Sequence, residues 1–249
     1  MRTIPADSTT WRVDRISRSS VWRTVAYAYA LTCIVALSLG AADESVGSGK
    51  SYLALGDSYT IGEGVDPAAR WPVQLVTALT ARGVPLEAPR IIARTGWTTR
   101  DLLAAIHSLK PPGPFDLVTL QIGVNDQYQG NDPELFRRDL RLVLSEAVLL
   151  AGGRSAHVIA VSIPDWGVTP FARGQDAAAI GTDIDAFNAV LRAEASAAGV
   201  ACVSVTESSR QAGRDPTLVV ADGLHPSAAL YARWVALIAP PAAVAAGRP

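Results

Sequence analysis

The chain has 249 residues, of which 49% are hydrophobic and 18% are charged, and its formal net charge is −1. This composition is typical of a globular protein, and the length suffices for one domain of about 200 residues with a sizeable core. The near-neutral charge argues against a nucleic-acid-binding surface and against an acidic polymer as a partner. We expect a monomer.

The N-terminal part, residues 1–42, has the pattern of a targeting segment. An arginine-rich leader precedes residues 25–42, which carry no charge, and acidic residues follow directly. Together with the small residues Gly40 and Ala42, this pattern predicts a signal peptide that is cleaved after Ala42. The same uncharged run is long enough for an N-terminal membrane anchor, and a buried helix is a third interpretation. The signal peptide and the anchor both imply an exported domain, which would be periplasmic, secreted or membrane-anchored.

Neither the segment after this leader nor the cysteines indicate a cofactor site. Residues 43–50 predict a flexible linker. Its glycines do not form a phosphate-binding loop, because Glu44 stands where the first glycine of that motif would be. The two cysteines, Cys33 and Cys202, lack the spacing of a metal site. We expect no cofactor and no metal.

Beyond the linker, apolar runs alternate with amphipathic stretches. The apolar runs predict strands over residues 51–55, 87–93, 116–121, 157–162 and 200–205. Helical spacing, caps and breakers predict helices over residues 71–81, 98–109, 132–151, 183–198 and 227–238. Pro240 and Pro241 lie beyond the last helix, so we expect residues 241–249 to form a C-terminal tail. This alternation predicts one α/β domain over residues 51–240, with a parallel sheet covered by helices on both faces.

Polar residues and a glycine follow several of these strands directly. Ser58 follows the first strand, Gly96 the second and Asn125 the third, while Asp222 and His225 lie between the fifth strand and the last helix. Ligands of parallel sheets sit beyond the carboxyl ends of the strands. We therefore expect these residues to meet at one rim of the sheet.

The residue types on this rim suit nucleophilic catalysis. Ser58 could be a nucleophile if His225 accepts its proton and Asp222 fixes the tautomer of the imidazole. The backbone N–H groups of Gly96 and Ser58 and the amide of Asn125 could stabilise an oxyanion. Each residue also has a structural interpretation as a turn former or helix cap. Their joint placement on one rim favours a site.

Four short blocks of sequence carry a resemblance to a known family. They are, in chain order, Gly56-Asp57-Ser58, Gly96, Gly123-Val124-Asn125-Asp126 and Asp222-Gly-Leu-His225-Pro226. With these blocks, the chain resembles the SGNH (GDSL-type) hydrolases over about residues 51–240, with Tyr59 where many members have leucine. The Gly-x-Ser-x-Gly turn of the other large class of serine hydrolases does not occur in the sequence.

The resemblance implies a flavodoxin-like three-layer α/β/α fold with a five-stranded parallel sheet. It also implies hydrolysis of carboxylic esters or thioesters without a metal. In such proteins Ser58 takes the role of nucleophile and His225 with Asp222 completes the triad. Gly96 and Asn125 then join Ser58 in the oxyanion hole. The aspartate of the first block is generally structural.

The indications of a substrate come from aromatic residues. Trp97, Tyr128 and Trp166 follow strands on the same rim and could line a pocket for an acyl group or a sugar. Alternatively, the aromatic residues of 163–171 pack a long loop onto the domain. The loops outside residues 163–182 are too short to form a lid, which favours small or flexible acyl esters.

We therefore expect an exported serine hydrolase with the activity of an esterase, lipase or lysophospholipase. Its partner would be a small ester or lipid, and membrane attachment through residues 25–42 belongs to the anchor interpretation. An acyltransferase and a carbohydrate O-acetylesterase of the same fold are enzymatic alternatives. A non-catalytic envelope-binding domain is an alternative from another class of protein.

Overall fold

The computed structural model describes residues 49–247. The predicted signal peptide or anchor over residues 1–42, and the linker up to residue 48, lie outside these residues.

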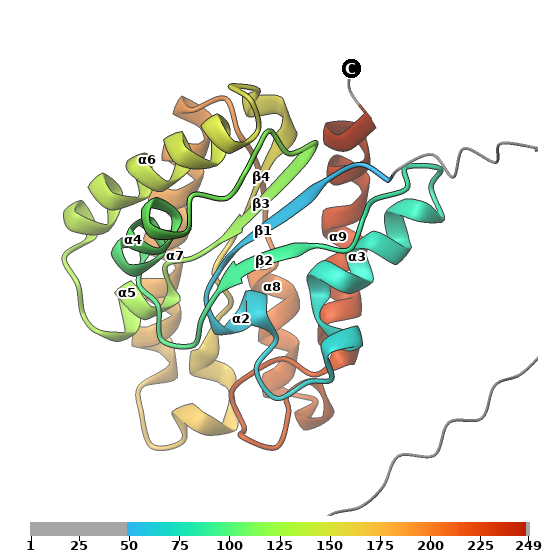
Figure 1. The fold of residues 1–249 in the computed structure, drawn as a ribbon. Coiled ribbons are helices and arrows are strands. Elements are labelled where there is room, and N and C mark those ends of the chain that lie inside the picture. Colours follow the sequence, from blue (N-terminus) through green and yellow to red (C-terminus); the bar gives the residue numbers. More distant parts are fainter. Residues whose placement is uncertain (1–48, 248–249) are drawn as a thin grey trace, which may run out of the picture. The chain divides into compact units, whose positions relative to one another are not determined.

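A five-stranded parallel sheet forms the centre of the described domain (Figure 1). Its strands lie in the order β2-β1-β3-β4-β5. They are β1 (Tyr52–Gly56), β2 (Arg90–Ala93), β3 (Leu117–Gln121), β4 (Val158–Val161) and β5 (Ala201–Val203). Every residue of β1, β3 and β4 is buried. Continuous burial is expected of central strands that are covered on both faces, so the prediction of an α/β parallel sheet is confirmed.

Helices cover both faces of the sheet and complete three layers (Figure 1). On one face, α3 packs against α9, and α9 contacts β3 and β4. On the other face, α6 packs against both α4 and α7. These helices are α3 (Trp71–Thr80), α4 (Thr99–Leu109), α6 (Pro133–Leu150), α7 (Ala177–Ala197) and α9 (Ala228–Gly247).

Local sequence sets where several of these helices begin. Thr98 caps α4 through a capping box with Asp101, and Asp132 caps α6 by accepting from Glu134 N. Asp176 caps α7 by accepting from the N–H groups of residues 178 and 179. This cap starts α7 at residue 177 instead of 183, so part of the loop predicted over 163–182 is helical.

The prediction for the end of the last helix is wrong. The helix α9 continues through Pro240 and Pro241 to Gly247, so residues 241–247 belong to it and do not form a tail. A proline inside a helix costs about 3 kcal/mol or more, because it removes a backbone hydrogen bond and crowds the preceding turn. Burial of the small residues Ala242, Ala245 and Ala246 against the domain offsets this cost.

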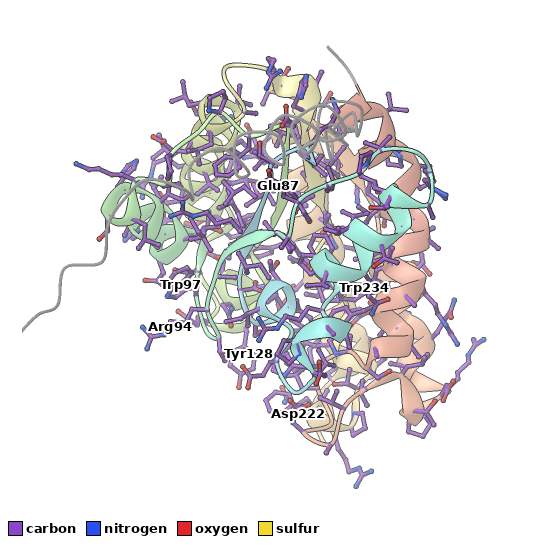
Figure 2. The ribbon with its side chains drawn as sticks, turned by 45° about the vertical axis from the view of Figure 1, so that its right-hand side comes forward. Glu87, Arg94, Trp97, Tyr128, Asp222 and Trp234 are labelled. Carbon is purple, nitrogen blue, oxygen red and sulfur yellow. The ribbon has the colours of Figure 1, made fainter. Side chains whose placement is uncertain are left out.

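The helix α9 is a core element of the domain. Its length and hydropathy would also suit a membrane span. However, two aromatic residues of this helix, Tyr231 and Trp234 (Figure 2), are fully buried in the domain. We therefore assign α9 to the core.

Candidate active site

The first predicted site residue, Ser58, begins the short helix α2 (Ser58–Ile61) two residues after β1 ends. Asp57 caps this helix, since its Oδ1 accepts a hydrogen bond from Tyr59 N at 3.0 Å. The turn needs glycine at position 56, because a Cβ there would lie 2.1 Å from Thr60 Oγ1 and 2.4 Å from Gln121 O. The close turn between strand and helix brings Ser58 to the carboxyl edge of the sheet.

Asp57 itself is almost completely buried behind Ser58. Burial raises the pKa of its carboxyl to about 7, although hydrogen bonds from the backbone of Tyr59 and from its own N–H lower it. Within residues 49–247, its buried Oδ2 atom has no hydrogen-bond partner. Asp57 thus shapes the turn, in agreement with the structural role that the resemblance implies.

The pair Asp222 and His225 lies on a single turn just before α9. His225 Nδ1 is 2.7 Å from Asp222 Oδ2, and Asp222 Oδ1 accepts from the backbone N–H groups of His225 (3.0 Å) and Leu224 (2.8 Å). Burial raises the pKa of the Asp222 carboxyl, but these hydrogen bonds outweigh that effect and hold the pKa below its ordinary value. Asp222 is therefore an ionised acceptor, and the other ring nitrogen of His225, Nε2, is left for a second partner.

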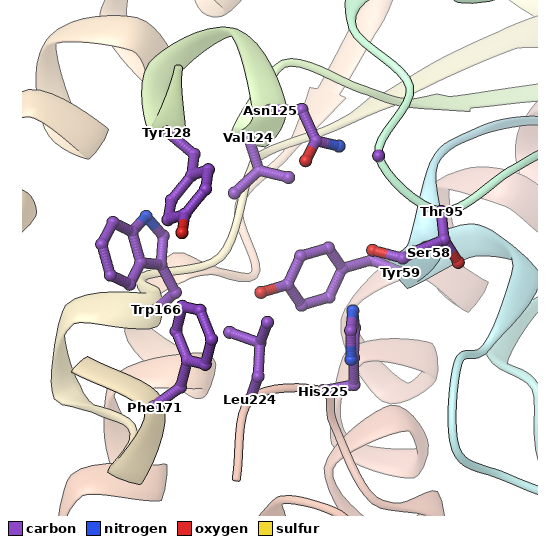
Figure 3. A pocket seen from close by; sticks show the side chains of 11 residues that line it. Ser58, Tyr59, Thr95, Val124, Asn125, Tyr128, Trp166, Phe171, Leu224 and His225 are labelled. Carbon is purple, nitrogen blue, oxygen red and sulfur yellow. The ribbon is translucent and has the colours of Figure 1, made fainter. Parts of the chain in front are cut away.

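A single cavity of about 150 Å³ joins the two halves of the predicted site (Figure 3). Ser58 and His225 both line it, and so do Gly96 and Asn125. Asp222 lies behind His225 and holds its ring. The carboxyl ends of β1, β2 and β3 thus bring together residues from across the chain, as the topology predicts.

The candidate oxyanion donors are held in place by the backbone. Asn125 lies on α5 (Val124–Tyr128), and its Nδ2 donates a hydrogen bond to Trp97 O at 2.9 Å. This bond leaves the second N–H of the amide available. Gly96 has a φ of +84°, a conformation that side-chain-bearing residues rarely adopt. The requirement for glycine there comes from the backbone, because a Cβ would meet nothing within 4 Å.

A buried carboxylate links the loop with Gly96 to the helix with Asn125. Asp126 Oδ2 accepts hydrogen bonds from Thr99 N at 2.8 Å and Thr99 Oγ1 at 2.9 Å. Burial raises the pKa of the Asp126 carboxyl, while the hydrogen bonds from Thr99 lower it. Because Thr99 begins α4, this link ties α4 to α5 at the rim.

Two of the three aromatic residues predicted to bind substrate line the cavity. Tyr128 and Trp166 are on its wall, whereas Trp97 is not (Figure 3). The side chain of Trp97 is half-buried and packs against the core, and its backbone carbonyl oxygen accepts the hydrogen bond from Asn125. The prediction that Trp97 lines the cavity is therefore wrong.

Two residues of the cavity wall, Tyr59 and Leu224, were not predicted from the sequence. Tyr59 directly follows the candidate nucleophile, and Leu224 directly precedes the candidate base. Their positions next to these residues in the sequence could have predicted their place on the cavity wall. Phe171 is part of the aromatic segment over 163–171, but its place on the wall depends on how that loop folds back.

Three aromatic rings form one end of the cavity. Tyr128 packs edge-on against Trp166 with centroids 5.3 Å apart, and Phe171 lies 6.0 Å from Trp166 and 6.2 Å from Tyr128. Trp166 is buried, and its Nε1 donates to Gln127 Oε1 at 2.8 Å. Such edge-to-face pairs stabilise a fixed arrangement of rings. We call Tyr128, Trp166 and Phe171 the aromatic end.

The described residues offer no evident metal site. Among residues 49–247, no group of three or more His, Cys, Asp or Glu side chains could hold a metal ion. The one described cysteine, Cys202, is free, and burial raises the pKa of its thiol. Its surroundings are therefore those of an inert thiol.

The fold and the position of the site define a class of protein. The five strands form a parallel sheet in the order β2-β1-β3-β4-β5 between two helical layers, and the four sequence blocks lie at its carboxyl edge. This is the fold of the SGNH hydrolases. The chain belongs to the GDSL-like Lipase/Acylhydrolase family, whose model matches residues 54–233.

Solved structures agree with this assignment. The structure of TesA is similar with a TM-score of 0.61 at 23% identity, covering 77% of this chain and 97% of that one. Axe2, an acetylxylan esterase from Geobacillus stearothermophilus, is similar with a TM-score of 0.55 at 19% identity, and the match covers 82% of this chain and 97% of that one. A lipase/acylhydrolase from Enterococcus faecalis is similar with a TM-score of 0.55 at 25% identity, and the match covers 77% of this chain and 94% of that one. No curated protein sequence matches the chain.

Proposed function

We propose that the protein hydrolyses carboxylic esters through Ser58, His225 and Asp222. The observation that carries this proposal is that Ser58 and His225 line one cavity, while Asp222 Oδ2 lies 2.7 Å from His225 Nδ1. Membership in the GDSL-like Lipase/Acylhydrolase family supports the same class of reaction.

The first half of the reaction forms an acyl-enzyme. His225 Nε2 takes the proton of Ser58 Oγ as this oxygen attacks the acyl carbon. The negative charge that develops on the carbonyl oxygen is stabilised by the N–H groups of Ser58 and Gly96 and by the free N–H of Asn125. His225 then gives its proton to the alcohol oxygen, and the bond from that oxygen to the acyl carbon breaks. Asp222 stabilises the transient imidazolium.

The second half releases the acid. Water loses a proton to His225 Nε2 and attacks the acyl carbon, and the same donors stabilise the second oxyanion. Collapse of this intermediate breaks the bond to Ser58 Oγ, which regains its proton from His225. The enzyme returns to its starting state.

The two sides of Ser58 differ, and this difference orients the ester. Towards the aromatic end the cavity is apolar and includes the buried Trp166. On the opposite side (Figure 3) Thr95 is exposed, and its hydroxyl donates a hydrogen bond to the carboxylate of Glu63. The acyl group stays bound while the alcohol departs, so we place the acyl group in the apolar cavity and the alcohol on the Thr95 side.

The site of action is also part of the proposal. The arginine-rich leader and the uncharged run over residues 25–42 support export from the cytoplasm. An exported esterase would meet esters outside the cytoplasmic membrane.

Steady-state hydrolysis of p-nitrophenyl acetate and butyrate tests the proposal. The wild-type chain should cleave these esters, and Ser58→Ala should reduce turnover by at least about 10³-fold. Ser108→Ala is the matched control, because Ser108 is exposed on α4 and outside the cavity. Folded wild-type protein without esterase activity, or a Ser58→Ala variant with full activity, would overturn the proposal.

A further inference from the structure

The side chain of Tyr59 is buried in the domain, and its hydroxyl faces the cavity. The Tyr59 side chain is only 3% exposed, and its hydroxyl points towards the aromatic end (Figure 3). Within residues 49–247, this hydroxyl makes no hydrogen bond, and, unlike Asp57 Oδ2, it is not fully enclosed but opens into the cavity. The backbone carbonyl of Tyr59 accepts a hydrogen bond from Tyr231. A hydroxyl that opens into a cavity can pair with an ordered water or with a ligand that displaces this water.

The Tyr59 ring is held in one orientation. It lies 5.3 Å from the His225 ring on one side and 6.2 Å from the Trp234 ring on another. The Tyr231 hydroxyl donates to Tyr59 O at 3.0 Å and fixes the backbone below the ring. A donor that is fixed in advance loses little entropy on binding, which favours its use in recognition.

The other groups at this end of the cavity leave the Tyr59 hydroxyl as an unpaired donor on its inner wall. Val124, Leu224 and Phe171 are apolar, and the Trp166 N–H is already bound to Gln127. Tyr128 also carries a hydroxyl, but its side chain is 55% exposed and reaches solvent. Burial raises the pKa of the Tyr59 phenol well above its ordinary value. It is therefore neutral and can donate at any physiological pH.

The size of the cavity indicates how large a group it can enclose. Its volume is about 150 Å³. A cavity of about this volume in another protein binds one benzene molecule, which has six heavy atoms. An acyl group of about four to six carbons is the corresponding size for an ester.

We propose that the cavity selects short acyl groups that carry an oxygen within the chain, and that the Tyr59 hydroxyl donates a hydrogen bond to this oxygen. The inference rests on the proposed esterase function. It assigns a specificity-determining role to Tyr59, and it defines the substrate class as esters of short hydroxy, keto or ether acids.

Pairs of isosteric esters test this role. The full chain is assayed with p-nitrophenyl pentanoate against its β-methoxypropanoate analogue, and with the hexanoate against the γ-methoxybutanoate. In each pair an ether oxygen replaces one methylene at nearly constant size. Each kcat/KM is divided by the rate constant for hydroxide-catalysed hydrolysis of the same ester, which removes differences in intrinsic reactivity.

The measured quantity is the ratio of ether to hydrocarbon ester, compared between variants. In at least one pair, this ratio should be about tenfold higher for the wild type than for Tyr59→Phe, which keeps the ring and removes only the hydroxyl. Tyr128→Phe is the matched control, since it removes the exposed hydroxyl of the same cavity, and it should retain the wild-type ratio. Thermal unfolding of each variant checks that the fold is intact.

Two outcomes would overturn the inference. One is an equal ratio in the wild type and Tyr59→Phe, and the other is a ratio that falls only in Tyr128→Phe. In both cases the esters are cleaved and the proposed function stands. If the folded wild type cleaves no ester, the proposed function fails as well.

Discussion

The hydroxyl of Tyr231 donates a hydrogen bond to the backbone carbonyl of Tyr59 at a distance of 3.0 Å. Tyr231 lies on α9 near the end of the chain, and Tyr59 lies on α2 directly after the candidate nucleophile. This buried bond therefore connects the last helix to the turn that presents Ser58.

Removal of this bond should destabilise the domain. Tyr231→Phe leaves the carbonyl of Tyr59 without this donor in a buried position, so we expect the free energy of unfolding to fall by about 1–3 kcal/mol. Urea denaturation followed by circular dichroism measures the change. Because the ring of Phe still fills the space, an unchanged midpoint would mean that the hydrogen bond contributes nothing to stability.

Asn125→Ala should impair catalysis without unfolding the protein. The loss of one oxyanion donor is expected to reduce kcat by roughly 10²–10³-fold, because its effect is largest in the transition state. Steady-state kinetics with p-nitrophenyl butyrate measure the effect. Gln129→Ala, which removes an exposed amide just after α5, serves as the control. A loss below about fivefold would remove Asn125 from the oxyanion hole.

The carboxyl of Asp57 should make stability depend on pH. Its pKa is raised to about 7 in the folded protein from an ordinary value of 3.8. Between these two pH values, the folded state therefore holds a proton that the unfolded state has released. The stabilisation is complete below the unfolded pKa, falls as pH rises from there, and is lost once pH passes the folded pKa. A shift of this size corresponds to at most about 4 kcal/mol.

Asp57→Asn should abolish this pH dependence, since the amide is neutral throughout and its oxygen can still accept from Tyr59 N. Urea unfolding of both proteins in steps from acid to mildly alkaline pH gives the difference in free energy of unfolding. The free energy of unfolding of the wild type, relative to that of the variant, should be highest at acid pH and should decrease as pH rises. A difference that is constant with pH would show that folding does not raise the pKa of Asp57.

The aromatic end should limit the length of the acyl chain. A series of p-nitrophenyl esters from acetate to palmitate should give the highest kcat/KM for short acyl groups. Phe171→Ala, at a side chain that is 42% exposed, should move the optimum to longer chains, because it opens the end of the cavity with little loss of core packing. If the wild type prefers long chains, or if the variant keeps the wild-type profile, the acyl group does not occupy this end.

The N-terminal prediction can be tested by mass. If residues 1–42 are a signal peptide that is cleaved after Ala42, the first residue of the mature protein should be Asp43. Intact-mass measurement of the protein from the culture supernatant or periplasm gives this terminus. An intact Met1 in the membrane fraction would instead support the anchor interpretation.

The sequence predicted which of the candidate residues meet at one edge of the sheet, because topology decides most of this arrangement. Ser58, Gly96 and Asn125 each follow a strand, and the carboxyl ends of parallel strands must share one edge. Asp222 and His225 are three residues apart, so one turn suffices to bring them into contact. These placements need no knowledge of side-chain packing.

Predictions that depended on packing were less successful. Trp97 follows Gly96 in sequence, but its ring packs against the core and does not face the cavity. The two prolines of α9 indicated a helix end, yet burial of the alanines beyond them outweighs the local cost. The place of Tyr59 on the cavity wall likewise depends on the rings of His225 and Trp234 packed against it.

Covalent labelling tests the central claim most directly. A fluorophosphonate reacts with an activated serine, so the folded wild-type protein should gain one adduct, and peptide mass analysis should locate it on Ser58. Ser58→Ala should not be labelled, whereas Ser108→Ala should be labelled like the wild type. Absence of labelling in folded wild-type protein, or an adduct on another serine, would contradict the assignment of Ser58 as the nucleophile.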